Sequence, residues 1–177
     1  GNFIKGGYVG IVLEYTSIAI KGEGNVIEGN TIEGANAYGI RADNQGGLNI
    51  DGNFVRLRST GSSSTFGYGI YAGYADTFTF QKNIILDPKD WGMYIFEPNF
   101  QNGATVTQPA NIVNNMISSD APWQTTTPRG MYITGDVKWT NVFHNSISIT
   151  DPGGRCLEVY PFTFYNIDSL DVRNNSF

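Results

Sequence analysis

An asparagine followed two positions later by an apolar residue recurs seven times along this 177-residue chain. The asparagines are Asn2, Asn30, Asn53, Asn83, Asn115, Asn145 and Asn175, and the separations between them are 28, 23, 30, 32, 30 and 30 residues. The residues two positions later are Ile4, Ile32, Val55, Ile85, Ile117, Ile147 and Phe177. A period of this length indicates stacked repeats.

A second recurring pattern is a glycine followed by an apolar residue. Its copies are Gly10-Ile11, Gly39-Ile40, Gly69-Ile70, Gly92-Met93 and Gly130-Met131, with Cys156-Leu157 in the sixth repeat. Another apolar or alanine side chain follows two positions later in each copy, which is the period of one strand face. A third apolar residue precedes most of the asparagines by three positions. Each repeat is therefore predicted to hold three short strands and no helix, which makes the chain all-β.

The asparagine is expected at a bend between two strands. Asparagine tolerates the left-handed backbone region, and asparagines stacked at equivalent bends can exchange hydrogen bonds. Gly29, Gly52 and Asn114, each just before an asparagine, suit the same bend.

These columns, with repeats such as "GNTI" at 29–32 and "NNMI" at 114–117, resemble the right-handed parallel β-helix of the pectin-lyase-like superfamily. The resemblance covers the whole chain. It implies an all-β solenoid of about six coils with three short strands in each. A left-handed β-helix is less favoured because no hexapeptide period is present.

Residues 1–177 are expected to form a single β-helix segment. The chain starts at "GNFIKG" and stops at "NNSF", both in mid-coil, so we expect it to be uncapped at both ends and to continue into further coils or domains of a longer protein. The resemblance implies an extracellular or cell-surface location.

Composition bears on the partners. The net charge of −5 with only 11 Lys and Arg residues argues against nucleic acid, because phosphate binding needs clustered basic side chains. No apolar run approaches the roughly 20 residues of a membrane-spanning helix. A neutral ligand or a protein surface fits better. The single Cys156 excludes an internal disulfide.

The residues after the inward Gly-apolar positions should point outward from one sheet face. This face is predicted to carry an aromatic stripe formed by Tyr71, Trp91, Tyr94, Phe96, Tyr132 and Tyr160. Exposed aromatic patches mark binding surfaces, and rings suit the C–H faces of sugars, so a polysaccharide or cell-surface glycan is the expected ligand. The alternative is that the aromatic side chains only stabilise the sheet by stacking.

Two further groups of residues could carry chemistry. Asp87, Asp120 and Asp151 recur after the asparagine strand and would suit Ca²⁺ if they stacked in a row, although Asp before or near Pro is also ordinary turn chemistry. No other cofactor is expected. Arg129, Arg155 and Glu158 are the candidate catalytic residues, next to two long connections at 97–110 and 118–130, the second of which bears Trp123.

Two functions follow from these patterns. The preferred one is a secreted or cell-surface β-helix segment that acts as a structural, adhesive or carbohydrate-contacting module without catalysis. The alternative is a polysaccharide lyase or glycoside hydrolase that acts on an extracellular polysaccharide. The Asp-Asp, Gly-His-Gly and Arg-x-Lys motifs of polygalacturonases are missing from the chain, which favours the first.

Overall fold

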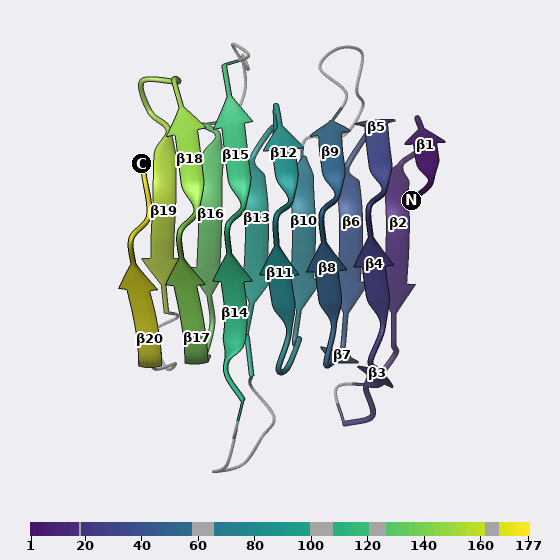
Figure 1. Ribbon diagram of the computed structural model, residues 1–177, viewed down its shortest axis with the longest axis vertical. Helices are drawn as coiled ribbons and strands as arrows, with labels where there is room; N and C mark the ends of the chain where they lie inside the picture. The colour runs from purple at the N-terminus through teal and green to yellow at the C-terminus, as the bar shows by residue number, and fades with distance from the viewer. Residues whose placement is uncertain (18, 58–65, 100–107, 121–126, 162–166) are drawn as a thin grey trace.

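The structure, a computed structural model, describes residues 1–17, 19–57, 66–99, 108–120, 127–161 and 167–177. These residues form a rod of stacked coils in which three six-stranded sheets run side by side along the axis (Figure 1). In Figure 1 sheets A and D face the viewer, with A above D, and sheet B lies behind them. The described residues contain no helix, so none of them forms a helix able to cross a membrane.

The sheets take one strand from each coil. Sheet A holds β1 (Phe3–Lys5), β5 (Thr31–Ala35), β9 (Phe54–Leu57), β12 (Ile84–Leu86), β15 (Met116–Ser119) and β18 (Ser146–Ile149). Sheet B holds β2 (Val9–Glu14), β6 (Tyr38–Asp43), β10 (Tyr68–Gly73), β13 (Trp91–Phe96), β16 (Arg129–Thr134) and β19 (Arg155–Tyr160). Sheet D holds β4 (Val26–Glu28), β8 (Asn49–Asp51), β11 (Thr79–Gln81), β14 (Ala110–Val113), β17 (Val137–Phe143) and β20 (Ile167–Arg173). The short strands β3 (Gly22–Glu23) and β7 (Gln45–Gly46) pair as sheet C.

Every strand pair in the three large sheets is parallel and joins equivalent residues of neighbouring coils. In sheet B, for example, the inward column runs through Ile40, Ile70, Met93 and Met131, all fully buried. The inward columns of sheets A and D behave alike, so like side chains stack into one continuous core along the rod. The predicted parallel solenoid of six coils, with three strands in each, is confirmed.

The asparagines form a hydrogen-bonded ladder between sheets D and A. The side-chain amide of each donates to Oδ1 of the asparagine in the next coil over 2.9–3.1 Å, from Asn2 through Asn175. The backbone N–H of each also donates to that same oxygen. The expectation that asparagine itself takes the left-handed conformation is wrong. Positive φ falls on the residue before it, for example Gly52, Lys82 and His144. Asparagine is needed at this position because its amide both donates and accepts.

The glycine column of sheet B exists because the coils approach too closely for any side chain. A Cβ placed on Gly10, Gly39, Gly69, Gly92 or Gly130 would lie 2.5–2.6 Å from the carbonyl oxygen of the equivalent residue in the next coil. Strands β6, β10, β13 and β16 each bury two consecutive residues, the glycine and the apolar residue after it. The side chain of the residue before the glycine therefore points to the outer face of the sheet.

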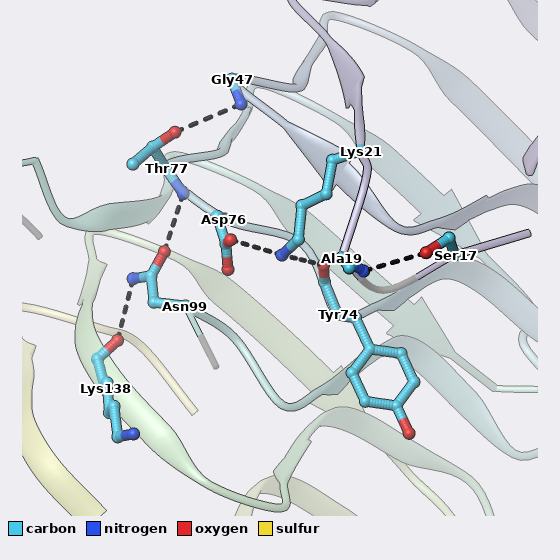
Figure 2. A network of polar contacts seen from close by, with 9 residues as sticks. All are labelled: Ser17, Ala19, Lys21, Gly47, Tyr74, Asp76, Thr77, Asn99 and Lys138. Carbon is cyan, nitrogen blue, oxygen red and sulfur yellow. Dashed lines mark hydrogen bonds and ion pairs between the residues drawn. The ribbon is translucent and has the colours of Figure 1, made fainter. Parts of the chain in front are cut away.

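A second polar ladder holds the corner between sheets B and D (Figure 2). The N–H of Gly47 donates to Thr77 Oγ1 over 3.2 Å, and the N–H of Thr77 donates to Asn99 Oδ1 over 2.7 Å. Asn99 Nδ2 then donates to the carbonyls of Lys138 and Trp139 in the coil beyond, over 2.9 and 3.1 Å. The corner is therefore tied along four coils by hydrogen bonds.

Lys21 ties the first coil to the third across the same corner. Its Nζ donates to the Tyr74 carbonyl over 2.8 Å and forms an ion pair with Asp76 (Figure 2). The Lys21 and Asp76 side chains are each only 7% exposed. A buried pair of this kind costs much desolvation, so each charge depends on the other.

Candidate functional site

The outer face of sheet B carries the predicted aromatic column. The strand register stacks Tyr71, Tyr94 and Tyr132 on successive coils, with Arg41 before them and Glu158 after them. The next outward column stacks Glu14, Asp43, Gly73, Phe96, Thr134 and Tyr160. The register therefore places Tyr71, Tyr94, Phe96, Tyr132 and Tyr160 in two neighbouring columns of one sheet.

A third outward column contains Tyr38 and Tyr68, which the sequence reasoning missed. The register stacks Tyr38, Tyr68 and Trp91 on three coils, and Arg129 and Arg155 continue the same column. If side chains alternated strictly between the two faces of the strand, Tyr68 would point inward. Gly69 and Ile70 are both buried, however, so Tyr68 lies on the outer face together with Tyr71. The signal was an aromatic residue directly before the glycine in three successive repeats.

The rings of the two columns stack on one another along the rod. Tyr38 and Tyr68 have ring centroids 4.8 Å apart and an interplanar angle of 5°, and Tyr68 and Trp91 follow at 4.9 Å and 14°. Tyr71 and Tyr94 stack at 5.4 Å and 10°. Edge-on contacts join the two columns, such as Tyr68 with Tyr94 at 5.5 Å. The rings in the middle have their faces covered by neighbouring rings, so a ligand would meet ring edges and hydroxyl groups.

The tyrosine hydroxyl groups are the polar groups of this face. The hydroxyls of Tyr68, Tyr71 and Tyr94 have no hydrogen-bond partner among the described residues, yet they are not closed off from solvent. Burial raises the pKa of all three hydroxyls above the ordinary tyrosine value. The hydroxyls therefore stay protonated at neutral pH, and each can donate as well as accept.

The three candidate catalytic residues come together at the C-terminal end of this face. Arg129 Nε lies 2.8 Å from Glu158 Oε2, and Arg155 forms a second ion pair with the same carboxylate. The Arg129 guanidinium also lies 5.4 Å from the Trp91 ring centroid. The two oxygens of the Glu158 carboxylate are therefore each taken up by a different arginine.

A second charged group flanks the N-terminal end of the face. Arg41 Nε donates to Asp43 Oδ2 over 2.7 Å, and Arg41 Nη2 lies 3.7 Å from Glu14 Oε1. Burial raises the pKa of the Asp43 carboxyl, and the neighbouring Arg41 partly offsets this. The aromatic face is thus bounded by an acid-rich group at one end and an arginine-rich group at the other.

Asp87, Asp120 and Asp151 do not form the stacked row that was the condition for a Ca²⁺ site. Measured from the buried isoleucine of each coil in sheet A, Asp87, Asp120 and Asp151 stand two, three and four positions later, so they do not stack. Asp87 pairs with Arg56 at 3.0 Å, and Asp151 Oδ1 accepts the N–H of Gly153 over 2.9 Å. An ion pair thus accounts for Asp87 and a turn for Asp151. Within the described ranges, no three His, Cys, Asp or Glu side chains are grouped as metal ligands.

The two long connections join sheet B at opposite ends of its strands. The connection at 97–110 follows β13 and leads to β14, whereas 118–130 leads from β15 into the start of β16 (Figure 1). Residues 100–107 and 121–126, with Trp123 among them, lie outside the described residues.

The comparisons with known proteins identify the architecture alone. A search of curated proteins finds no match, and neither does a search of solved structures. A family model described as "Right handed beta helix region" matches residues 2–177. Together with the all-parallel coils, this match shows that the chain belongs to the right-handed β-helix family.

Proposed function

We propose that this β-helix is a non-catalytic, glycan-contacting module of a secreted or cell-surface protein. The outer face of sheet B is the contact surface. The single observation that carries the proposal is the repeated, solvent-reaching row of unpartnered tyrosine hydroxyls between two charged groups. A polysaccharide offers matching donors and acceptors at regular intervals, and it can lie along a flat face without a deep pocket.

The charged side chains of this face support binding over catalysis. Glu158 is engaged by Arg129 and Arg155, while Asp43 is engaged by Arg41. An acid–base mechanism needs one group free to give a proton and another free to take it. These pairs instead offer a ligand fixed hydrogen-bonding groups.

A polysaccharide lyase or glycoside hydrolase is the second candidate. One observation favours it, which is that Arg129, Arg155 and Glu158 meet at the end of the aromatic face. Ligand binding would have to separate at least one of these ion pairs before either partner could act as an acid or base.

The test is a glycan array probed with the chain, with release of unsaturated or reducing ends followed on each glycan that binds. The informative variant is Tyr94→Phe with Tyr132→Phe, which removes two hydroxyls and leaves the stacked rings in place. Losing two hydrogen bonds should weaken binding by about tenfold or more. Trp139→Phe is the control, since Trp139 is 42% exposed but lies on sheet D.

Three results separate the candidates. Retention without product, weakened by the tyrosine variants but not by the Trp139 variant, supports the binding module. Product formation supports the enzyme instead. Retention that the tyrosine variants leave unchanged, or no retention at all, refutes the proposed contact surface.

A further inference from the structure

The N-terminal half of the aromatic face contains a gap in its second outward column at Gly73. The register places Gly73 between Asp43 of the preceding coil and Phe96 of the next. Gly73 is not among the residues with a left-handed backbone, so its conformation does not require glycine. A Cβ there would lie 2.6 Å from Asp43 Oδ1 and 3.1 Å from the Tyr71 hydroxyl oxygen. The absence of a side chain therefore makes room for a carboxylate and a hydroxyl.

The two groups that share this space are each only partly satisfied. Asp43 Oδ2 accepts from Arg41 Nε over 2.7 Å, which fixes the orientation of the carboxylate. Asp43 Oδ1 and the Tyr71 hydroxyl have no hydrogen-bond partner in the described part of the chain. The Asp43 side chain is nevertheless only 12% exposed. Asp43 Oδ1 is not among the buried unpartnered atoms, so it still reaches solvent and is open to a donor group of a ligand.

The charge around the gap limits what that ligand group can be. The groups that face Asp43 are Arg41 on its own strand, Glu14 on β2 and Tyr71 on β10. With one cation against two carboxylates, this end of the face has an excess negative charge and disfavours an anion. Burial and Asp43 both raise the pKa of the Tyr71 hydroxyl, so it remains a donor beside the carboxylate acceptor.

We propose that Asp43 and Tyr71, placed over Gly73, form a subsite that binds the hydroxyl groups of a neutral sugar residue. The carboxylate accepts from one hydroxyl, and the tyrosine hydroxyl donates to or accepts from its neighbour. This inference rests on the proposed function and narrows it, because it assigns an uncharged sugar to the acid-rich end of the face. It also makes Gly73 a specificity-determining position, since a methyl group there would lie 2.6 Å from Asp43 Oδ1 and displace the carboxylate from the subsite.

The experiment is titration calorimetry of the chain with neutral gluco-, manno- and galacto-oligosaccharides, and with uronate oligosaccharides of the same length. We expect at least one neutral series to bind more tightly than the uronates. Asp43→Asn keeps the shape of the side chain, and Tyr71→Phe keeps the stacked ring. Each should weaken the neutral ligand about tenfold, as expected for a hydrogen bond to a charged or buried group.

Gly73→Ala tests the space itself. It should weaken binding as strongly as Asp43→Asn, and combining the two changes should add little because both act on one subsite. Independent, additive losses would overturn the shared subsite. Circular dichroism and the melting temperature check that each variant stays folded, and the two conservative variants decide the question if Gly73→Ala does not fold.

The failures of the two proposals are distinguishable. If Tyr94→Phe with Tyr132→Phe weakens binding of a neutral ligand while Asp43→Asn and Tyr71→Phe do not, the subsite is wrong and the contact surface stands. Tighter binding of the uronates would overturn the subsite in the same way. If no oligosaccharide of either kind binds, both proposals are wrong.

Discussion

Replacing Asn83 with alanine should be among the most destabilising single changes in this rod. Asn83 is fully buried, and its Oδ1 accepts from the backbone N and from Nδ2 of Asn53 over 3.1 and 3.0 Å. Its Nδ2 donates to the Ile50 carbonyl over 2.8 Å and to Asn115 Oδ1 over 3.0 Å. All four hydrogen bonds disappear in Asn83→Ala, and the backbone N–H of Asn53 is left buried without a partner.

The magnitude follows from those four bonds. A buried donor without a partner costs about 1–3 kcal/mol, and each remaining bond contributes about 0.5–1.5 kcal/mol net. Because the contributions of neighbouring groups overlap, we expect the free energy of unfolding to fall by about 3–5 kcal/mol.

The assay is urea unfolding followed by circular dichroism, with the slope compared between variants to confirm that the same surface is exposed. The matched control is Asn141→Ala on the outer face of sheet D. There Asn141 Nδ2 donates to Asn111 Oδ1 over 3.0 Å in a partly exposed position, so the loss should stay below about 1 kcal/mol. Equal losses of unfolding free energy for the two variants would refute the reasoning. Burial of the asparagine ladder would then not determine how much its hydrogen bonds contribute.

Three further changes can be tested in the same way. Lys21→Met should lower the free energy of unfolding by about 3–5 kcal/mol, since it strands the buried Asp76 charge, and adding Asp76→Leu should restore most of the loss in a urea titration. Gly92→Ala places a Cβ 2.5 Å from a carbonyl oxygen of the next coil, so a loss of about 1–3 kcal/mol is expected by thermal melting, and an unchanged melting temperature would contradict the close approach. Burial raises the pKa of the Asp43 carboxyl, so protonation of this group favours the folded state below that pKa. Protonation also removes the proposed acceptor for the sugar hydroxyl. Sugar binding should therefore weaken on acidification at a higher pH than it would with an ordinary aspartate. That acid limb should be absent in Asp43→Asn.

The fold could be predicted from the sequence because the repeat fixes the alignment of all equivalent residues in neighbouring coils together. The position of Ile85, for instance, fixes its neighbours in the adjoining coils, since parallel in-register stacking leaves no other alignment of the apolar columns. The aromatic face could be predicted for the same reason. Tyr38 and Tyr68 were missed because a simple alternation of faces does not allow for two consecutive buried residues.

Other features depend on contacts that no local pattern encodes. Lys21 and Asp76 are separated by 55 residues and by an intervening coil, so nothing in either segment indicates the pair. For three aspartates the local pattern is present, but the contact that it suggests is not. Asp87, Asp120 and Asp151 share a local sequence context, but each is one position further from the core strand than the last. Stacking requires equal offsets, which the shared motif does not guarantee.

The asparagine ladder also separates the length of a repeat from its geometry. The sequence distance between successive ladder residues ranges from 23 to 32, while their side-chain hydrogen bonds stay within 2.9–3.1 Å. The extra residues are taken up in the connections, of which 97–110 is one. Selection can therefore lengthen, shorten or replace a connection without altering the spacing of the coils beneath it. A rod of this construction acquires new surface chemistry by insertion at its edges, independently of the columns that keep it folded.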